Sequence, residues 1–204
     1  MRFMGRMETE NSGRHTSIQQ PSRLSLKNTE VKVWDLFIRA FHWSLVALVA
    51  TAFLSADWRE VHLWSGYAVC SLLAARMMWG FIGPRYARFG NFLKSPSAVR
   101  AYVRSVLERR APRYLGHNPA GGAMVAALLL MLAAVSITGV LLQTDPFWGS
   151  ETMQMWHGVL ANIAVALLPI HIAGVIITGV RLRENLIWSM ITGRKRAPKD
   201  GDVV

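Results

Sequence analysis

Four long apolar segments constrain the fold of this chain more strongly than any other feature. They cover about residues 36–56, 61–83, 120–142 and 155–180. Each approaches or exceeds the ~20 residues that an α-helix needs to cross the hydrocarbon core of a bilayer. The segments therefore predict an all-α fold, an integral membrane four-helix bundle within residues 31–196. Residues 1–30 and 197–204 are predicted to be cytoplasmic tails, the first of them flexible.

Basic residues gather in particular connections between these segments. The middle connection and the C-terminal part are rich in arginine and lysine, whereas the first and third connections together hold only Arg59. Cytoplasmic loops carry such an excess, so both termini and the middle connection are predicted to be cytoplasmic in a multi-pass protein of the bacterial inner membrane. This topology explains the net charge of +11 and argues against a nucleic-acid partner.

Two further features favour contact with a lipid bilayer. A short helix is predicted over about residues 96–110, lying on the inner membrane surface. One face of it carries Val99, Tyr102, Val103 and Val106. Six tryptophans near the predicted helix ends match an interfacial aromatic belt. They are Trp34, Trp58, Trp79, Trp148, Trp156 and Trp188.

Four of the six histidines fall inside predicted spans, where ionisable residues are costly and usually functional. The predicted topology puts His62 and His157 near the outer face, and His42 and His171 toward the cytoplasmic side. His171 follows His157 by fourteen residues, which is about 21 Å along a helix. Fourteen residues make nearly four turns, so both rings leave the fourth span on nearly the same side.

Two facing histidines at each of two depths predict two non-covalent b haems. Two imidazoles per iron leave no open coordination position, which favours electron transfer over oxygen binding. Gly66, Gly158 and Gly174 lie within one turn of a histidine and remove side-chain bulk there. Pro169, just before His171, is expected to bend the fourth span.

Two arginines are candidates for binding the anionic haem propionates. Arg76 lies fourteen residues after His62 and so near the inner histidine level, and Arg39 lies three residues before His42. The alternative for both is that the side chain snorkels to the cytoplasmic interface. The four histidines also have an alternative explanation as polar bridges between helices, which would not require two matched depths. His117, in the middle connection, is expected to be solvated, with a quinone-site role as its alternative.

The chain resembles the bacterial cytochrome b561 family, which includes the di-haem cytochrome b subunits of nickel–iron hydrogenases. The resembling stretches are "VWDLFIRAFHW", "HLWSGYAV", "RMMWGFIGPRYARF", "YLGHNPAGGAM", "WHGVLANIAVALLPIHIAG" and "ENLIWSMITGRKR". The resemblance implies haem ligands on the first, second and fourth spans, which correspond to His42, His62, His157 and His171. It also implies electron exchange between quinone or quinol and a periplasmic redox protein of the respiratory chain.

Several hypotheses are open for the periplasmic partner and for the reaction. Hydrogenase-type subunits often have an additional span, so four spans favour a c-type cytochrome over a hydrogenase as the periplasmic partner. One branch of the family oxidises superoxide at its outer face and reduces quinone, which is the enzymatic alternative. A haem-free membrane transporter or assembly factor is the alternative from another class. A b-type reduced-minus-oxidised spectrum would distinguish the cytochrome from it.

Overall fold

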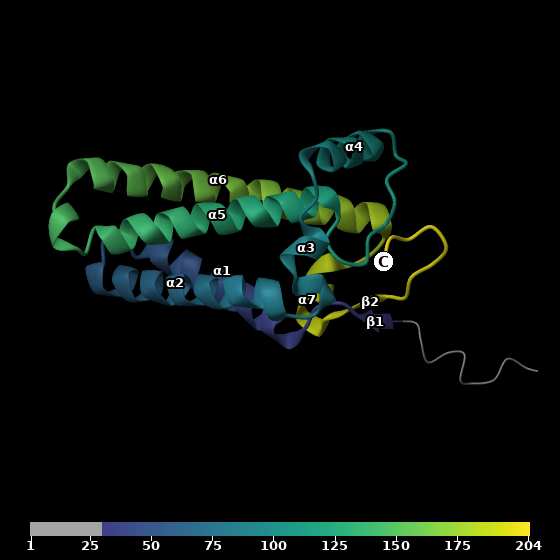
Figure 1. The fold of residues 1–204 in the computed structure, drawn as a ribbon, viewed down its shortest axis with the longest axis horizontal. Helices are drawn as coiled ribbons and strands as arrows, with labels where there is room; N and C mark the ends of the chain where they lie inside the picture. Colours follow the sequence, from purple (N-terminus) through teal and green to yellow (C-terminus); the bar gives the residue numbers. More distant parts are fainter. Residues whose placement is uncertain (1–29) are drawn as a thin grey trace, which may run out of the picture.

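The structure is a computed structural model that describes residues 30–204. Four long helices run side by side along its length: α1 (Leu36–Leu54), α2 (Arg59–Ile82), α5 (Pro119–Leu141) and α6 (Glu151–Leu182) (Figure 1). All four are long and apolar enough to cross a membrane. The predicted bundle of four membrane helices is therefore confirmed. The predicted N-terminal tail, residues 1–30, lies outside the described residues except for Glu30.

Side-chain caps fix where three of these helices begin. Asp35 accepts a hydrogen bond from the Ile38 amide at the start of α1, and Asn118 does the same for Gly121, with Pro119 at the first position of α5. Such caps satisfy amides that have no partner within the helix. Ser150 caps α6, so this helix begins at Glu151, four residues earlier than predicted. It continues through Pro169 to Leu182.

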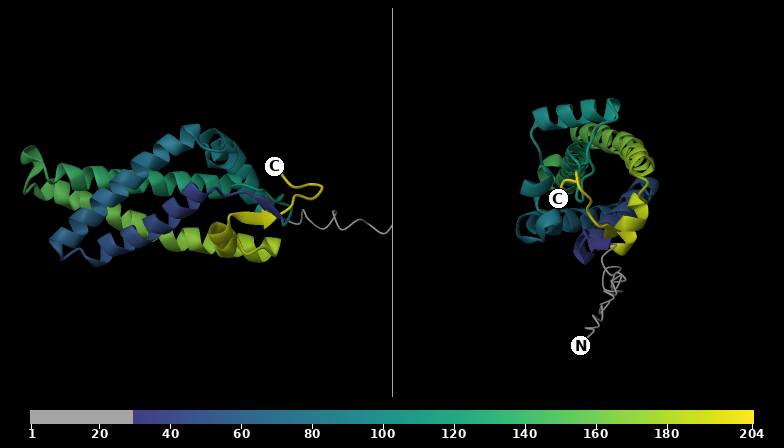
Figure 2. Two further views of the ribbon diagram at one scale, coloured as in Figure 1. Left: turned by 90° about the horizontal axis from the view of Figure 1, so that it is seen from below. Right: turned by 90° about the vertical axis from the view of Figure 1, so that its right-hand side faces the viewer.

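The shorter elements gather at one end of the bundle, here called the inner end because the predicted topology puts it at the cytoplasmic face (Figures 1 and 2). The middle connection supplies η2 (Arg85–Ala87), α3 (Phe89–Phe92) and α4 (Pro96–Leu107). After α6 come α7 (Leu186–Thr192) and β2 (Arg194–Arg196), which pairs antiparallel with β1 (Glu30–Lys32). The opposite end has only the α1–α2 connection and η3 (Asp145–Phe147).

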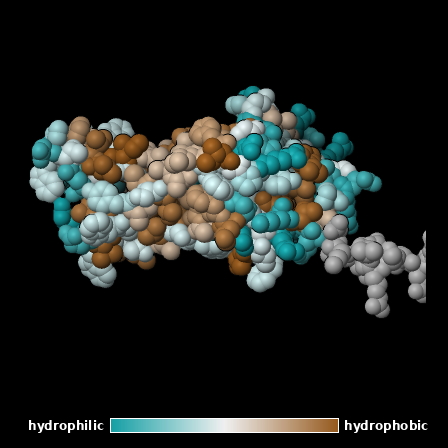
Figure 3. Space-filling model, turned by 60° about the horizontal axis from the view of Figure 1, so that its bottom comes forward, coloured by the Kyte–Doolittle hydropathy of each residue, from teal (hydrophilic) through white to brown (hydrophobic). Residues whose placement is uncertain are grey.

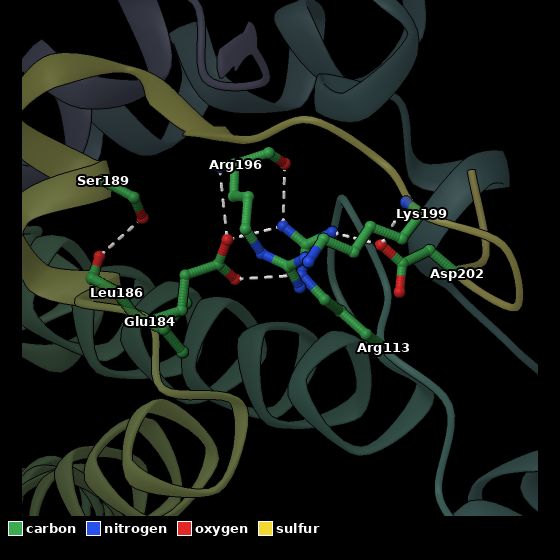
Figure 4. A network of polar contacts seen from close by, with 7 residues as sticks. All are labelled: Arg113, Glu184, Leu186, Ser189, Arg196, Lys199 and Asp202. Atoms are coloured by element: carbon green, nitrogen blue, oxygen red, sulfur yellow. Dashed lines mark hydrogen bonds and ion pairs between the residues drawn. The ribbon is translucent and has the colours of Figure 1, made fainter. Parts of the chain in front are cut away.

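The C-terminal residues are docked onto this inner end. Val203 forms a parallel bridge with Tyr114. Arg113, whose side chain is 4% exposed, pairs with both Glu184 and Asp202 and also donates to the Arg196 carbonyl (Figure 4). One arginine therefore joins the segment before α5, the end of α6 and the last residues of the chain. Although burial raises the pKa of Glu184, its bonds to Arg113 hold it below its usual value.

The surface corrects part of the predicted aromatic belt. Apolar side chains cover the long middle of the molecule and hydrophilic ones lie at both ends (Figure 3). Trp58, Trp148, Trp156 and Trp188 are exposed, as an interfacial belt requires. Trp34 is only 5% exposed and packs inside the inner end. Its place near a helix end was therefore misleading, because the segment of α7 and β2 folds over it.

The predicted interfacial helix corresponds to α4, but the two sides of its apolar face have different neighbours. Tyr102 is buried and packs against the Tyr114 ring, 5.6 Å away. Val103 and Leu107 are exposed. Part of the face expected to meet lipid therefore meets protein. The location of α4 on the membrane surface stays a prediction.

Candidate functional site

The structure brings His62 and His157 together at the outer level. The ring of His62, on α2, and that of His157, on α6, have centres 6.0 Å apart and planes at 82°. Both rings are partly buried. These helices are far apart in sequence, so the juxtaposition depends on the packing of the bundle.

Each outer histidine is oriented by a contact from a neighbouring helix. The Nδ1 atom of His62 lies 2.8 Å from the Ala52 carbonyl oxygen on α1. The Nδ1 atom of His157 lies 3.1 Å from the Val135 carbonyl oxygen and 3.0 Å from the Thr138 hydroxyl, both on α5. A carbonyl only accepts, so Nδ1 carries the proton and Nε2 keeps its lone pair for a metal. This is the usual support of a metal-binding histidine.

Two residues of this support escaped the sequence reasoning. Thr138 contacts His157 directly, and a Cβ atom on Gly139 would lie 3.1 Å from His157 Cε1. The glycine therefore gives the imidazole its space. The available signal was a small polar residue followed by glycine, near the outer end of an otherwise apolar span.

At the inner level, His42 lies on α1 and His171 on α6. The Nδ1 atom of His42 is buried and has no hydrogen-bond partner within the described residues. His171 is fourteen residues beyond His157 on one continuous helix, which separates the two levels by about 21 Å. The structure thus places His62 beside His157, and the pairing of His42 with His171 stays a prediction.

Unpartnered buried polar atoms are concentrated near the inner histidines. Across residues 30–204 such atoms occur on five side chains: Arg39, His42, Arg76, Trp79 and His117. Buried polar groups are ordinarily hydrogen-bonded. All five side chains belong to the inner halves of α1 and α2 or to the residues just before α5. Their donors suit a ligand that carries acceptor groups.

Neither arginine candidate simply extends into solvent. Arg76 is 3% exposed, donates to the Ala87 carbonyl oxygen at 3.0 Å, and lies 4.9 Å from the centre of the Phe89 ring. The Arg76 side chain is therefore buried within the protein and does not extend to the membrane interface. Arg39 is partly buried and donates from Nη1 to the Ile191 carbonyl oxygen, which connects α1 to α7. Its Nε atom stays without a partner.

The solvated environment expected for His117 is wrong. Its ring packs 4.8 Å from Trp34 and 5.1 Å from Phe92, and its Nδ1 atom is buried. Burial, together with the positive charges of Lys195 and Arg76 and the nearby His171 and His42, lowers the pKa of His117 to about 3. The ring is therefore neutral at physiological pH. It was misplaced because folding of the C-terminal segment covers the middle connection.

Lys195, in β2, belongs to the C-terminal segment that covers the middle connection, and it is buried there. It is 7% exposed, and its Nζ atom lies 5.3 Å from the centre of the Trp34 ring. Burial lowers the pKa of Lys195 to about 8, although the negative charge of Glu184 acts to raise it. Trp34 thus contacts both His117 and Lys195, and the inner end is strongly basic inside as well as outside.

The residues present fit a b-type haem. The outer imidazoles have their Nδ1 atoms occupied, which leaves the metal-binding nitrogens available. A Cβ atom on Gly66 or Gly158 would meet nothing within 4 Å, so there is open space beside the outer histidines. The core is thin: among the described residues of α6, only Ala164 is buried. The unpartnered donors at the inner end suit propionate carboxylates.

A four-helix membrane bundle with two adjacent histidines at one level and two further histidines toward its other end has the architecture of a membrane cytochrome b. The chain belongs to the prokaryotic cytochrome b561 family, whose sequence model matches residues 33–193. Two curated relatives, from Azotobacter vinelandii and Azotobacter chroococcum mcd 1, are each named "Probable Ni/Fe-hydrogenase B-type cytochrome subunit". Each is 25% identical over 150 residues, covering 58% of this chain and 62% of the relative.

Membership confirms the resemblance found in the sequence. It identifies the chain as a bacterial membrane protein of electron transport, and a b-type cytochrome carries haem b. The chain spans less than two thirds of the length of these relatives.

Proposed function

We propose that this protein conducts electrons across the bacterial inner membrane, between the quinone pool and a periplasmic redox protein, through two non-covalent b haems. The pairing of four intramembrane histidines at two depths carries the proposal. His62 and His157 bind the outer haem, and His42 and His171 bind the inner one. Bound haem supplies reversible one-electron transfer.

Residues of this chain hold the two haems and occupy the ligand positions of each iron. Two imidazoles per haem would leave the iron no place for a third ligand, so the bound group would serve electron transfer. Ala52, Val135 and Thr138 fix the orientation of the outer rings through their Nδ1 atoms. At the inner level, Arg76 and Arg39 are the proposed partners of propionate oxygens, and the unpartnered Nδ1 of His117 is a third donor. No residue acts as a nucleophile.

The periplasmic partner is proposed to be a c-type cytochrome. The supporting observation is that the structure describes four candidate spans in residues 30–204, whereas hydrogenase-type subunits often have another. A nickel–iron hydrogenase is the second candidate, favoured by the printed names of the two curated relatives. Direct oxidation of superoxide at the outer haem is the enzymatic alternative, and both termini are proposed to be cytoplasmic.

Electron transfer in proteoliposomes tests the proposal. Quinol in the bilayer should reduce an external c-type cytochrome, and His62→Ala and His171→Ala should each abolish that reaction. His15→Ala, outside the described residues, is the matched histidine control and should retain it. A purified chain without haem would overturn the proposal in favour of a transporter or assembly factor. Quinone reduction by superoxide with no partner protein present would favour the enzymatic alternative.

A further inference from the structure

A basic pocket lies at the inner end of α2, outside the bundle interior. Its volume is about 610 Å³, and it is open to the surface. The residues that line it come from the last turn of α2 and from the connection that follows: Gly80, Phe81, Arg85, Arg88, Gly90 and Asn91. None of them belongs to the proposed haem site.

The polar side of this pocket is positively charged. No Asp or Glu of the described residues lies within 4 Å of the Arg85 or Arg88 guanidinium, whereas Arg104 pairs with Glu108. Arg88 donates from Nε to the Gly83 carbonyl oxygen at 2.6 Å. Arg85 donates from Nη2 to the oxygen of Val204, the last residue of the sequence, at 3.0 Å. Each guanidinium keeps further N–H groups for an anion.

The other side of the pocket is apolar and exposed. Phe81 and Ile82, at the end of α2, are 69% and 70% exposed. The Phe81 ring meets the Phe89 ring edge-on at 5.4 Å. Phe89 can approach because residue 80 is glycine: a Cβ atom there would lie 2.0 Å from Phe89 Cε2. The wall beside the arginines is therefore aromatic and continues into the membrane-facing surface of α2.

The pocket lies beside the end of α2, where this helix is predicted to leave the bilayer on the cytoplasmic side. The spanning helix α2 ends at Ile82, and Arg85 and Arg88 follow within two helical turns. We propose that this pocket binds an anionic phospholipid of the inner leaflet, with the phosphate on Arg85 and Arg88 and an acyl chain along Phe81 and Ile82. Basic pockets on the cytoplasmic side of membrane proteins recognise such headgroups. The proposal rests on the membrane topology and is independent of the electron-transfer proposal.

Lipid titration of the delipidated, haem-loaded protein, followed by native mass spectrometry, tests this site. Phosphatidylglycerol should bind in preference to phosphatidylcholine. The Arg85→Gln/Arg88→Gln variant should weaken the binding of phosphatidylglycerol by about 30-fold and leave that of phosphatidylcholine unchanged. The matched control is Arg100→Gln/Arg110→Gln, which removes two exposed charges from the same connection outside the pocket. It should bind phosphatidylglycerol as the unsubstituted protein does.

Two outcomes would overturn the proposal. Equal weakening in both double variants would show that only the overall charge of the connection matters. Displacement of the lipid by millimolar inorganic phosphate or by deacylated glycerophosphoglycerol would show a site for soluble phosphates. Resistance to both competitors supports a lipid site. The thermal unfolding midpoint of each variant, compared in the same detergent, establishes that lost binding does not reflect lost folding.

Discussion

The imidazole rings of His62 and His157 lie 6.0 Å apart at nearly a right angle, although the two residues belong to different helical hairpins. Each ring is held by a backbone carbonyl of the other helix in its own hairpin: Ala52 of α1 for His62, and Val135 of α5 for His157. The two hairpins therefore each contribute a ring and its support. Because packing of α2 on α5 brings the hairpins together, assembly of the bundle creates the outer site.

Substitution of the histidines should remove haem in pairs. His62→Ala and His157→Ala should lose the same spectral component, and His42→Ala and His171→Ala the other, because about 21 Å separates the levels along α6. Optical redox titration of the four variants measures this. Loss of one component in both His62→Ala and His171→Ala, with the other lost in His157→Ala, would contradict the pairing.

The Thr138 hydroxyl should tune the outer haem without being its ligand. Thr138→Val keeps the shape and removes the contact with His157 Nδ1. Loss of such support typically lowers metal-site affinity by about 10–100-fold, so we expect weaker retention of the outer haem or a shifted midpoint potential, with the inner haem unaltered. Thr51→Val is the control, since the Thr51 hydroxyl donates to the Ala47 carbonyl oxygen of its own helix. An identical outer potential and haem content in both variants would contradict this role.

Arg113 should stabilise the inner end far more than an exposed arginine of the same connection. Arg113→Gln removes the guanidinium from the carboxylates of Glu184 and Asp202, and breaking a buried pair costs about 3–5 kcal/mol. Arg104→Gln, which breaks an exposed pair with Glu108, should cost less than about 1 kcal/mol. Chemical unfolding in a constant detergent compares the two. Equal losses of stability would show that the network contributes no more than a surface pair.

The neutral state of His117 should make the inner end sensitive to acid. Its folded pKa of about 3 lies below the unfolded value of about 6.5, so the unfolded state binds the proton first as the pH falls. Stability is therefore fully present above about pH 6.5 and is lost progressively toward pH 3. Between pH 6.5 and 5 the unsubstituted protein should lose up to about 2 kcal/mol more than His117→Asn. Parallel pH profiles would contradict a neutral buried ring.

The orientation in the membrane is open to a direct test. A reporter active only in the periplasm, fused after Val204, should be inactive, because the connections rich in arginine and lysine are predicted to be cytoplasmic. A reporter active only in the cytoplasm is the control and should function at the same position. The reverse result would exchange the outer and inner haems.

The sequence by itself determined the four spans and the depth of the histidines, because both depend on local properties. Apolar length decides whether a helix can cross a bilayer, and a rise of about 1.5 Å per residue converts the spacing of His157 and His171 into depth. The cap formed by Asn118 was predictable for the same reason, because it contacts an amide only three residues away. The b561-like motifs, spread over most of the chain, indicated the family for the same reason.

Only the tertiary structure decided what surrounds these residues. The closeness of His62 to His157, the contact of Thr138 with His157, and the burial of Arg76 depend on how whole helices pack. His117 and Trp34 were misplaced because β2 and the C-terminal residues fold back over segments more than 70 positions earlier in the chain. Periodicity and composition describe one helix at a time, so they contain no information on which distant segment will cover it.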